Sequence, residues 1–243
     1  MRHVTTPPAA ADTTDIRLTT GYYLDPDGLG DYVTSLLARC ATVFDVKPLL
    51  IMDLDDPAAS GLDADKGGHI APGALVEGEV IVQAGARIEK GAMVTGPVLI
   101  CTGSVISAGA LIREHTVIGP GCRIGFNAEI TRSLLAGHIL AKHACFIGDS
   151  VVGRRVNLGA FCSTTGLRCD GGPIAEPAIE EITINLGGHR IGTGQTKFGA
   201  VIGDEVALPA GTTLAPGTLI GAGTSLYPRN QIGGFLPAGS RAR

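Results

Sequence analysis

One branched aliphatic residue recurs at every sixth position through the middle of the chain. The first run has no gap: Ile70, Val76, Val82, Ile88, Val94, Ile100, Ile106, Ile112, Ile118, Ile124 and Ile130. The period returns near the C-terminus at Ile202, Leu208, Leu214, Ile220, Leu226 and Ile232. Neither an amphipathic helix nor an alternating strand has a period of six. The pattern is typical of a hexapeptide parallel β-helix, in which the chain turns a corner every six residues and points one aliphatic side chain inward from each flat side.

This repeat divides the chain into three parts. Residues 1–20 are rich in Thr, Ala, Pro and Asp and are predicted to be disordered. Residues 21–65 are predicted to form a helical cap and linker: an amphipathic helix over residues 29–44, with Pro48 marking its end, covers the open first coil, and an exposed acidic linker follows. Residues 66–238 are predicted to form the β-helix, with about seven coils.

The repeat has two irregularities. The period slips near Ser133–Leu135, and spacing alone leaves open whether Phe146 or Ile147 points inward. Residues 163–197 then leave the repeat, and two alternating runs around Gly187–Gly188 predict a hairpin within this excursion. A loop that leaves a regular solenoid often lies beside the functional surface. The stretch between the two irregularities is therefore where chemistry is expected.

Composition and charge narrow the class of protein. The 243 residues include 36 Gly, 4% aromatic residues and no Trp, which suits a narrow prism with tight corners. A formal net charge of -4 without a long basic run argues against a nucleic-acid partner. No apolar stretch is long enough to cross a bilayer, so no membrane partner is expected. The cysteines lack metal-type spacing and the N-terminus lacks the apolar core of a signal peptide, so we expect reduced thiols and a cytoplasmic location.

Three strings near the irregularities resemble a known family. They are His-Ala-Cys-Phe-Ile-Gly-Asp-Ser from His143, Asn-Leu-Gly-Ala from Asn157, and Lys-Phe-Gly-Ala-Val-Ile-Gly-Asp from Lys197. In this order they resemble the C-terminal left-handed β-helix domain of sugar-1-phosphate nucleotidyltransferases, including the bifunctional glucosamine-1-phosphate acetyltransferases. The likeness covers residues 66–238 and leaves out the nucleotidyltransferase domain. It implies an all-β, left-handed parallel β-helix with a short N-terminal helix, assembled as a homotrimer with sites between subunits.

The resemblance also implies a chemistry. Members of the family transfer an acetyl group from acetyl-CoA to the amine of an amino-sugar phosphate, and this chain is expected to act on that substrate or a related amine. The general base falls on His143, because a neutral imidazole can take a proton as nitrogen attacks the thioester. Arg113 matches the arginine that holds the sugar phosphate, and Asn157 matches the asparagine near the amino sugar. The CoA site is implied to include three residues: Ala160, Lys197 and Ala222.

Some positions depart from the family pattern. A tyrosine beside the sugar is Phe146 here, so a hydroxyl is lost. A lysine of the phosphate pocket falls on Thr131, and the adjacent Arg132 is expected to take its place. The Gly-Ala corner and the asparagine of the following string are altered at Phe161, Cys162 and Gly166.

Two alternatives stay open at this point. His115, His138 and His143 have a spacing that resembles gamma-class carbonic anhydrases, in which histidines across a trimer interface hold zinc. The missing catalytic half and the altered pocket favour a second alternative, a non-catalytic scaffold or regulatory subunit of a sugar-phosphate nucleotidyltransferase.

Overall fold

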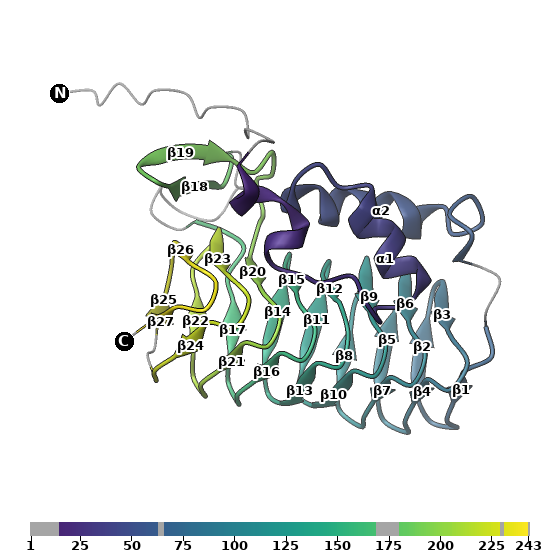
Figure 1. The fold of residues 1–243 in the computed structure, drawn as a ribbon. Coiled ribbons are helices and arrows are strands. Elements are labelled where there is room, and N and C mark those ends of the chain that lie inside the picture. Colours follow the sequence, from purple (N-terminus) through teal and green to yellow (C-terminus); the bar gives the residue numbers. More distant parts are fainter. Residues whose placement is uncertain (1–14, 63–65, 169–179, 229–230, 243) are drawn as a thin grey trace.

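The computed structural model describes residues 15–62, 66–168, 180–228 and 231–242, and its main body is a three-sided parallel β-helix (Figure 1). Each strand pairs in parallel with the equivalent strands one coil before and after it, which gives three sheets. Sheet I contains β1 (His69–Ile70), β4 (Arg87–Ile88), β7 (Val105–Ile106), β10 (Arg123–Phe126), β13 (Leu140–His143), β16 (Asn157–Leu158), β21 (Ala207–Leu208), β24 (Ser225–Leu226) and β27 (Arg241–Ala242).

The other two sheets complete each coil. Sheet II contains β2 (Leu75–Glu77), β5 (Met93–Thr95), β8 (Leu111–Ile112), β11 (Glu129–Thr131), β14 (Phe146–Gly148), β17 (Ser163–Thr164), β22 (Thr213–Leu214) and β25 (Gln231–Ile232). Sheet III contains β3 (Val80–Val82), β6 (Val98–Ile100), β9 (Thr116–Ile118), β12 (Leu134–Leu135), β15 (Val151–Val152), β20 (Ala200–Ile202), β23 (Thr218–Ile220) and β26 (Phe235–Leu236). The chain therefore makes about nine turns, and the sequence-based expectation of seven is wrong.

The six-residue column fills the interior of the prism. Ile88, Ile106, Ile124 and the other inward residues are almost fully buried in one continuous core. At about 25 cal/mol per Å² of apolar surface, the burial of such a column stabilises the stacking of each coil on its neighbours. The parallel β-helix predicted from the period is thus the observed fold.

The slip in the period has a simple cause. Val105 pairs with Arg123, eighteen positions later, whereas Val117 pairs with Leu134, seventeen positions later. A coil that is one residue shorter moves every inward position back by one. Ile147 is accordingly buried and Phe146 is 37% exposed, which settles the alternative that spacing left open.

A second hydrophobic core covers the outer face of sheet III. Outward side chains of that sheet pack against the N-terminal segment and the hairpin: Ile81, Leu99, Val117, Leu134, Val151, Val201 and Leu219. Figure 1 shows the helices along the N-terminal half of the prism and the hairpin near its C-terminal end. The hairpin joins β18 (Thr183–Leu186) to β19 (His189–Gly192) around the expected two glycines. Among the described residues, no comparable core forms over the outer faces of sheets I and II.

The N-terminal segment differs from the sequence-based expectation. The helix expected over residues 29–44 is α1 (Asp31–Ala38), followed by a 3-10 turn, η3 (Val43–Asp45), and a second helix, α2 (Val46–Asp55). Pro48 lies in the first turn of α2, where the missing N–H needs no helical partner, so it does not end a helix.

The expected cap and linker also differ. The helices cover the side of the prism rather than its open end, and Ile70 and Leu75 of the first coil are 45% and 62% exposed. Asp53, expected in an exposed linker, is buried in α2. Within the stretch expected to be disordered, residues 1–14 lie outside the described residues, but two 3-10 turns follow, η1 (Ile16–Leu18) and η2 (Thr20–Tyr22), because Leu18 and its neighbour Tyr23 enter the second core.

Two further expectations concern thiols and membranes. The described cysteines are free thiols: Cys40, Cys101, Cys122, Cys145 and Cys162. Burial raises the pKa of Cys122 and of Cys145 to about 12, so both are unreactive at neutral pH. Cys169 lies outside the described residues.

In the part of the chain that the structure describes, no helix has the length and hydrophobicity that a membrane span requires.

Candidate functional site

The predicted site residues gather mainly at the two edges of sheet II. We call these edges the I–II corner, where the chain passes from sheet I to sheet II, and the II–III corner, where it passes from sheet II to sheet III. A strand of sheet II is short, so roughly 10 Å separates the two edges at about 3.3 Å per residue. The residues that share an edge come from successive coils, because the ladder stacks equivalent positions.

His143 stands at the I–II corner. It is the last residue of β13 and is exposed, and it pairs with Phe126 on the preceding coil. The pairing of Leu140 with Asn157 carries Ala160 to the position beside His143 on the next coil. Among the described residues, no side chain hydrogen-bonds the His143 ring, which is exposed on the corner.

Asn157 and Phe161 frame this histidine. Asn157 is exposed on the outer face of sheet I, three residues before Ala160. Phe161 follows Ala160 and is 72% exposed, with a positive φ of 63°, a conformation that bulky residues rarely adopt. The ring therefore projects from the corner next to the histidine rather than packing against the prism.

Phe146 links the two edges of sheet II. It lies on the outer face between Glu129 and Ser163 of the neighbouring coils. A Cβ at Gly148 would lie 2.9 Å from Cζ of Phe146, so the ring runs along β14 toward the II–III corner. Because phenylalanine has no hydroxyl, it offers a ligand on this face an apolar surface and no hydrogen bond.

Arg113 and Arg132 lie together at the II–III corner. Arg113 donates from Nη1 to Oε1 of Glu129 at 2.9 Å and from Nη2 to Oε1 of Glu114 at 3.3 Å. Arg132 donates from Nη1 to the same Glu114 oxygen at 3.0 Å. Hydrogen bonding to Glu129 raises the pKa of Arg113, so its charge is fixed. The two arginines are thus neighbours, but each already has carboxylate partners.

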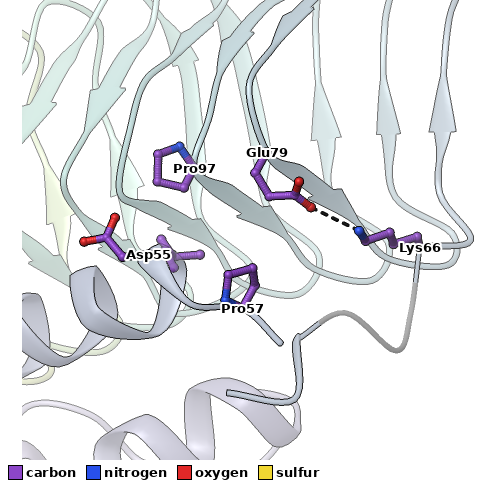
Figure 2. Close-up of a pocket in the computed structure, with 6 residues that line it drawn as sticks. Asp55, Pro57, Lys66, Glu79 and Pro97 are labelled. Atoms are coloured by element: carbon purple, nitrogen blue, oxygen red, sulfur yellow. Dashed lines mark hydrogen bonds and ion pairs between the residues drawn. The ribbon is translucent and has the colours of Figure 1, made fainter. Parts of the chain in front are cut away.

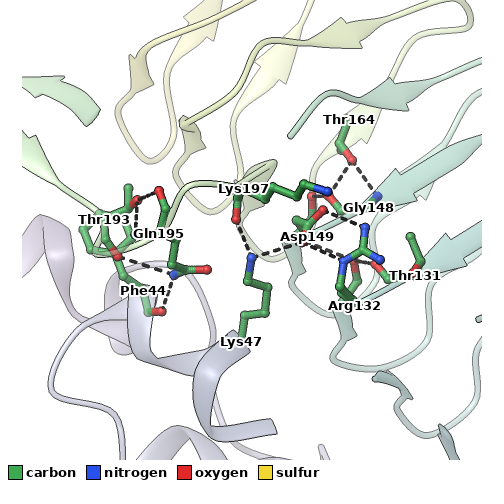
Figure 3. A network of polar contacts seen from close by, with 12 residues as sticks. Phe44, Lys47, Thr131, Arg132, Gly148, Asp149, Thr164, Thr193, Gln195 and Lys197 are labelled. Atoms are coloured by element: carbon green, nitrogen blue, oxygen red, sulfur yellow. Dashed lines mark hydrogen bonds and ion pairs between the residues drawn. The ribbon is translucent and has the colours of Figure 1, made fainter. Parts of the chain in front are cut away.

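Asp149 is the buried centre of this corner (Figure 3). Arg132 donates to it twice, from Nε to Oδ1 at 3.0 Å and from Nη2 to Oδ2 at 3.1 Å. Lys47 of α2 donates to Oδ1 at 3.0 Å and also bonds the carbonyl of Lys197. Burial lowers the pKa of Lys47, while the nearby Asp149 opposes that shift. Sequence reasoning did not find Lys47, because nothing in the repeat marks a contact with a helix a hundred residues earlier.

Lys197 also belongs to the II–III corner. The excursion leaves sheet II after β17 and returns to the same corner, where Phe198 N–H donates to the Gly166 carbonyl and Gly199 N–H donates to the Asp149 carbonyl. Figure 3 shows the Lys197 side chain extending toward Gly148 and Asp149. The structure therefore groups Lys197 with the two arginines and not with Ala160, its expected neighbour in a CoA site.

Ala222 lies apart from both corners of sheet II. It is half-buried at the corner between sheets III and I, where its backbone packs against Gly203. The three histidines of the zinc alternative are also dispersed: His115 lies at the II–III corner, bonded to Asp55 at 2.8 Å, and His138 lies at the III–I corner. Within the described ranges no three His, Cys, Asp or Glu side chains are arranged to hold a metal ion.

Two cavities of the subunit lie away from His143. One of about 400 Å³ lies beside the end of α2, between Asp55, Pro57, Pro97 and the ion pair of Lys66 with Glu79 (Figure 2). Another, of about 580 Å³, lies on the last coils of sheet II beside the base of the excursion. His143 itself is exposed at the I–II corner.

These features define a class, the hexapeptide-repeat parallel β-helix proteins, with a histidine at one corner and a cluster of cations at another. Comparison with known proteins then gives the family. The model of the "GMPPB C-terminal domain" family matches residues 94–222, more than half of the chain, so the chain belongs to this family.

Two relatives extend the comparison. A bifunctional sugar-1-phosphate nucleotidylyltransferase/acetyltransferase of Sulfurisphaera tokodaii is 33% identical over 75% of this chain and 44% of that protein. The bifunctional protein GlmU of Methanococcus aeolicus is 35% identical over 72% of this chain and 41% of that protein. The chain spans less than half the length of these relatives. A UDP-N-acetylglucosamine acyltransferase of Campylobacter jejuni covers 66% of this chain and 63% of its own at 17% identity, but its TM-score of 0.23 gives this likeness no weight. The names of the two relatives confirm the resemblance drawn from the three strings.

Proposed function

We propose that this protein transfers an acyl group from a CoA thioester to the amine of an amino-sugar phosphate or a related amine, with His143 as the general base. The observation that carries the proposal is the arrangement of sheet II: a histidine with no hydrogen-bond partner among the described residues at one edge, and Arg113, Arg132 and Lys197 at the other. The names of the relatives, which include acetyltransferases, support the reaction class.

The spacing of the two edges suits such an acceptor. Roughly 10 Å along a strand is comparable with the span of a sugar that carries a phosphate at one end and an amine at the other. The cations attract the phosphate, and Phe146 supplies an apolar floor between the edges. The His143 ring accepts the proton that the amine loses as its nitrogen forms the new bond to the acyl carbon, and the C–S bond breaks to release the thiol. Backbone N–H groups are expected to stabilise the oxyanion.

The residues assigned to CoA fit only in part. Small side chains at Ala160 and Ala222 leave the backbone accessible, as a narrow pantetheine arm requires, but Phe161 projects beside Ala160. When bound, CoA would supply the activated thioester. Ala160 and Ala222 lie at opposite edges of sheet I, so one donor is most simply held between two subunits. The open faces of sheets I and II, with sheet III covered, support a homotrimer built around those faces. Free thiols and a CoA substrate fit a cytoplasmic location.

A thiol-release assay tests the proposal. The protein should release CoA from acetyl-CoA with glucosamine-1-phosphate or galactosamine-1-phosphate, more slowly with glucosamine, which lacks the phosphate, and not with N-acetylglucosamine-1-phosphate, whose amine is blocked. Lack of turnover across acceptors and acyl donors would contradict the proposal. It would favour the scaffold alternative, which the carboxylate partners of Arg113 and Arg132 and the projecting Phe161 ring support.

A further inference from the structure

The buried lysine of α2 has no assigned role in any of the chemistry above. Lys47 Nζ reaches Oδ1 of Asp149, and the two side chains are only 9% and 7% exposed. Lys47 lies outside the part of the chain that matches the family model, which begins at residue 94. The N-terminal helices thus place a cation in the II–III corner that the β-helix itself does not contain.

A charge count shows what this cation changes. The linked cluster of ion pairs around Glu114 and Asp149 contains the cations Arg113, Arg132 and Lys47, with Lys197 beside it, and the anions Glu114, Glu129 and Asp149; His115 and Asp55 form a separate pair. Four positive and three negative charges leave this cluster with an excess of one positive charge. Without Lys47 the cluster would be neutral, and among the described residues the Asp149 carboxylate would keep only Arg132 as a charged partner.

The contacts of Asp149 make this excess available to a ligand. Its carboxylate accepts two hydrogen bonds from Arg132 and one from Lys47, so its charge is divided between a buried cation and a cation at the surface. The Arg132 side chain is 28% exposed and the Lys47 side chain is 9% exposed. Of these two cations, only Arg132 is exposed enough to contact a ligand. Lys47 neutralises part of the Asp149 charge from the buried side.

We infer that Lys47 is a positioning residue that sets the charge of the II–III corner, so that Arg113, Arg132 and Lys197 can hold the phosphate or another anionic group of the acceptor. The inference rests on the proposed function for its choice of ligand. It makes the N-terminal helices part of the binding site rather than a cover for sheet III.

A purely structural role for the Lys47–Asp149 pair predicts different behaviour. Buried ion pairs contribute little net stability compared with apolar residues of similar size, because both groups lose their hydration. Removing one partner leaves the other charge buried, so stability alone should suffer more from a single change than from the double change. If the pair only fastened α2 to the prism, the variants would differ in Tm, and those that stay folded would bind phosphate as tightly as the parent. If Lys47 sets the charge, removing Asp149 as well should restore anion binding.

Three variants separate these outcomes in the full chain. Lys47→Met removes the cation at similar volume and should weaken binding of inorganic phosphate and of glucosamine-1-phosphate by about five- to tenfold, the effect of one partly screened charge. Lys47→Met with Asp149→Asn restores the excess of one positive charge and leaves an oxygen for Arg132, so its Kd should return to within about twofold of the parent value. Arg39→Met breaks a different ion pair of the helices, with Asp53, and should lower the Tm without changing the Kd.

Calorimetric titration with phosphate, at a temperature where all variants are folded by circular dichroism, gives the answer. The inference is overturned if Lys47→Met binds phosphate as tightly as the parent, if the double variant binds more weakly than Lys47→Met, or if the parent protein binds no phosphate. Phosphate binding that follows the expected order in a protein without acyl transfer would leave this inference standing and contradict the proposed function alone.

Discussion

The two edges of sheet II have the same coil geometry but opposite surroundings. At the I–II corner, His143 and Phe161 project from the prism, and the described residues offer the imidazole no hydrogen-bond partner. At the II–III corner, Arg132 and Asp149 are held in ion pairs that reach into α2. The difference follows from what covers each edge, because the helices pack on sheet III and, of the two edges of sheet II, reach the II–III corner. Within the described residues, one subunit therefore orders its cations by itself, whereas its histidine stays exposed.

Replacing His143 should have the largest effect on activity and almost none on stability. His143→Ala removes an exposed base, so kcat/KM should fall at least about hundredfold while the Tm stays unchanged. His138→Ala is the matched control, because His138 is an exposed histidine at a corner away from sheet II. Steady-state assays and thermal melts check both. Activity retained in His143→Ala would place the base elsewhere.

A change at the II–III corner should instead affect binding and stability together. Arg132→Met leaves the buried Asp149 carboxylate with Lys47 as its remaining side-chain partner, which should lower the free energy of unfolding by about 1–3 kcal/mol. The KM for a sugar-phosphate acceptor should rise about tenfold because a charge-assisted phosphate contact is lost. Denaturant melts and initial rates measure the two effects.

Arg155→Met provides the comparison for that variant. Arg155 forms an exposed ion pair with Glu205 away from the II–III corner, so neither stability nor KM should change. If Arg132→Met and Arg155→Met lost stability and acceptor affinity equally, the ion pairs of the II–III corner would be no different from ordinary surface ion pairs.

Low pH should destabilise the helices that pack on sheet III before it destabilises the rest of the β-helix. This is the smallest of the expected effects. Burial acts to raise the pKa of Asp53, but hydrogen bonds from Arg39, Tyr32 and Ser60 outweigh it and hold the pKa below the usual 3.8. A depressed carboxyl pKa contributes stability that is present above pH 3.8 and is lost as the pH falls through the folded value. Asp53→Asn should therefore have a lower Tm than the parent near pH 7, and the gap should shrink below pH 3.8. A constant gap over this pH range would show that the carboxylate charge is not what secures the helices.

The sequence predicted the three-sided β-helix well, because one inward side chain per face of each coil determines that fold. Ile88 and Ile124 are inward for the same reason that they recur, namely that only an aliphatic side chain fits the interior of each coil. It could not place Phe146 and Ile147, since a coil shortened by one residue is visible only in the register of the sheets. The fold class was thus contained in local spacing, but the number of coils was not.

The site was predictable only as far as its parts are local. Arg113 and Arg132 come together because they occupy the same corner of successive coils, which the six-residue period stacks. Lys197 was expected beside Ala160, because a linear string does not show that the excursion returns to the corner it left. Lys47 was absent from the sequence-based set, since its partner Asp149 lies in a different element and no short motif joins them.

The parallel strand pairing of sheet II continues across the excursion without a change of register. Ser163 lies against Thr213, fifty positions later, in the same register that joins coils of ordinary length. A foreign peptide inserted at the hairpin tip, where a side chain at Gly188 would meet open space, should therefore leave the stacking on both sides undisturbed. The hairpin tip is therefore a suitable insertion point for a reporter peptide, provided that the strands of the hairpin, which pack on sheet III, are kept.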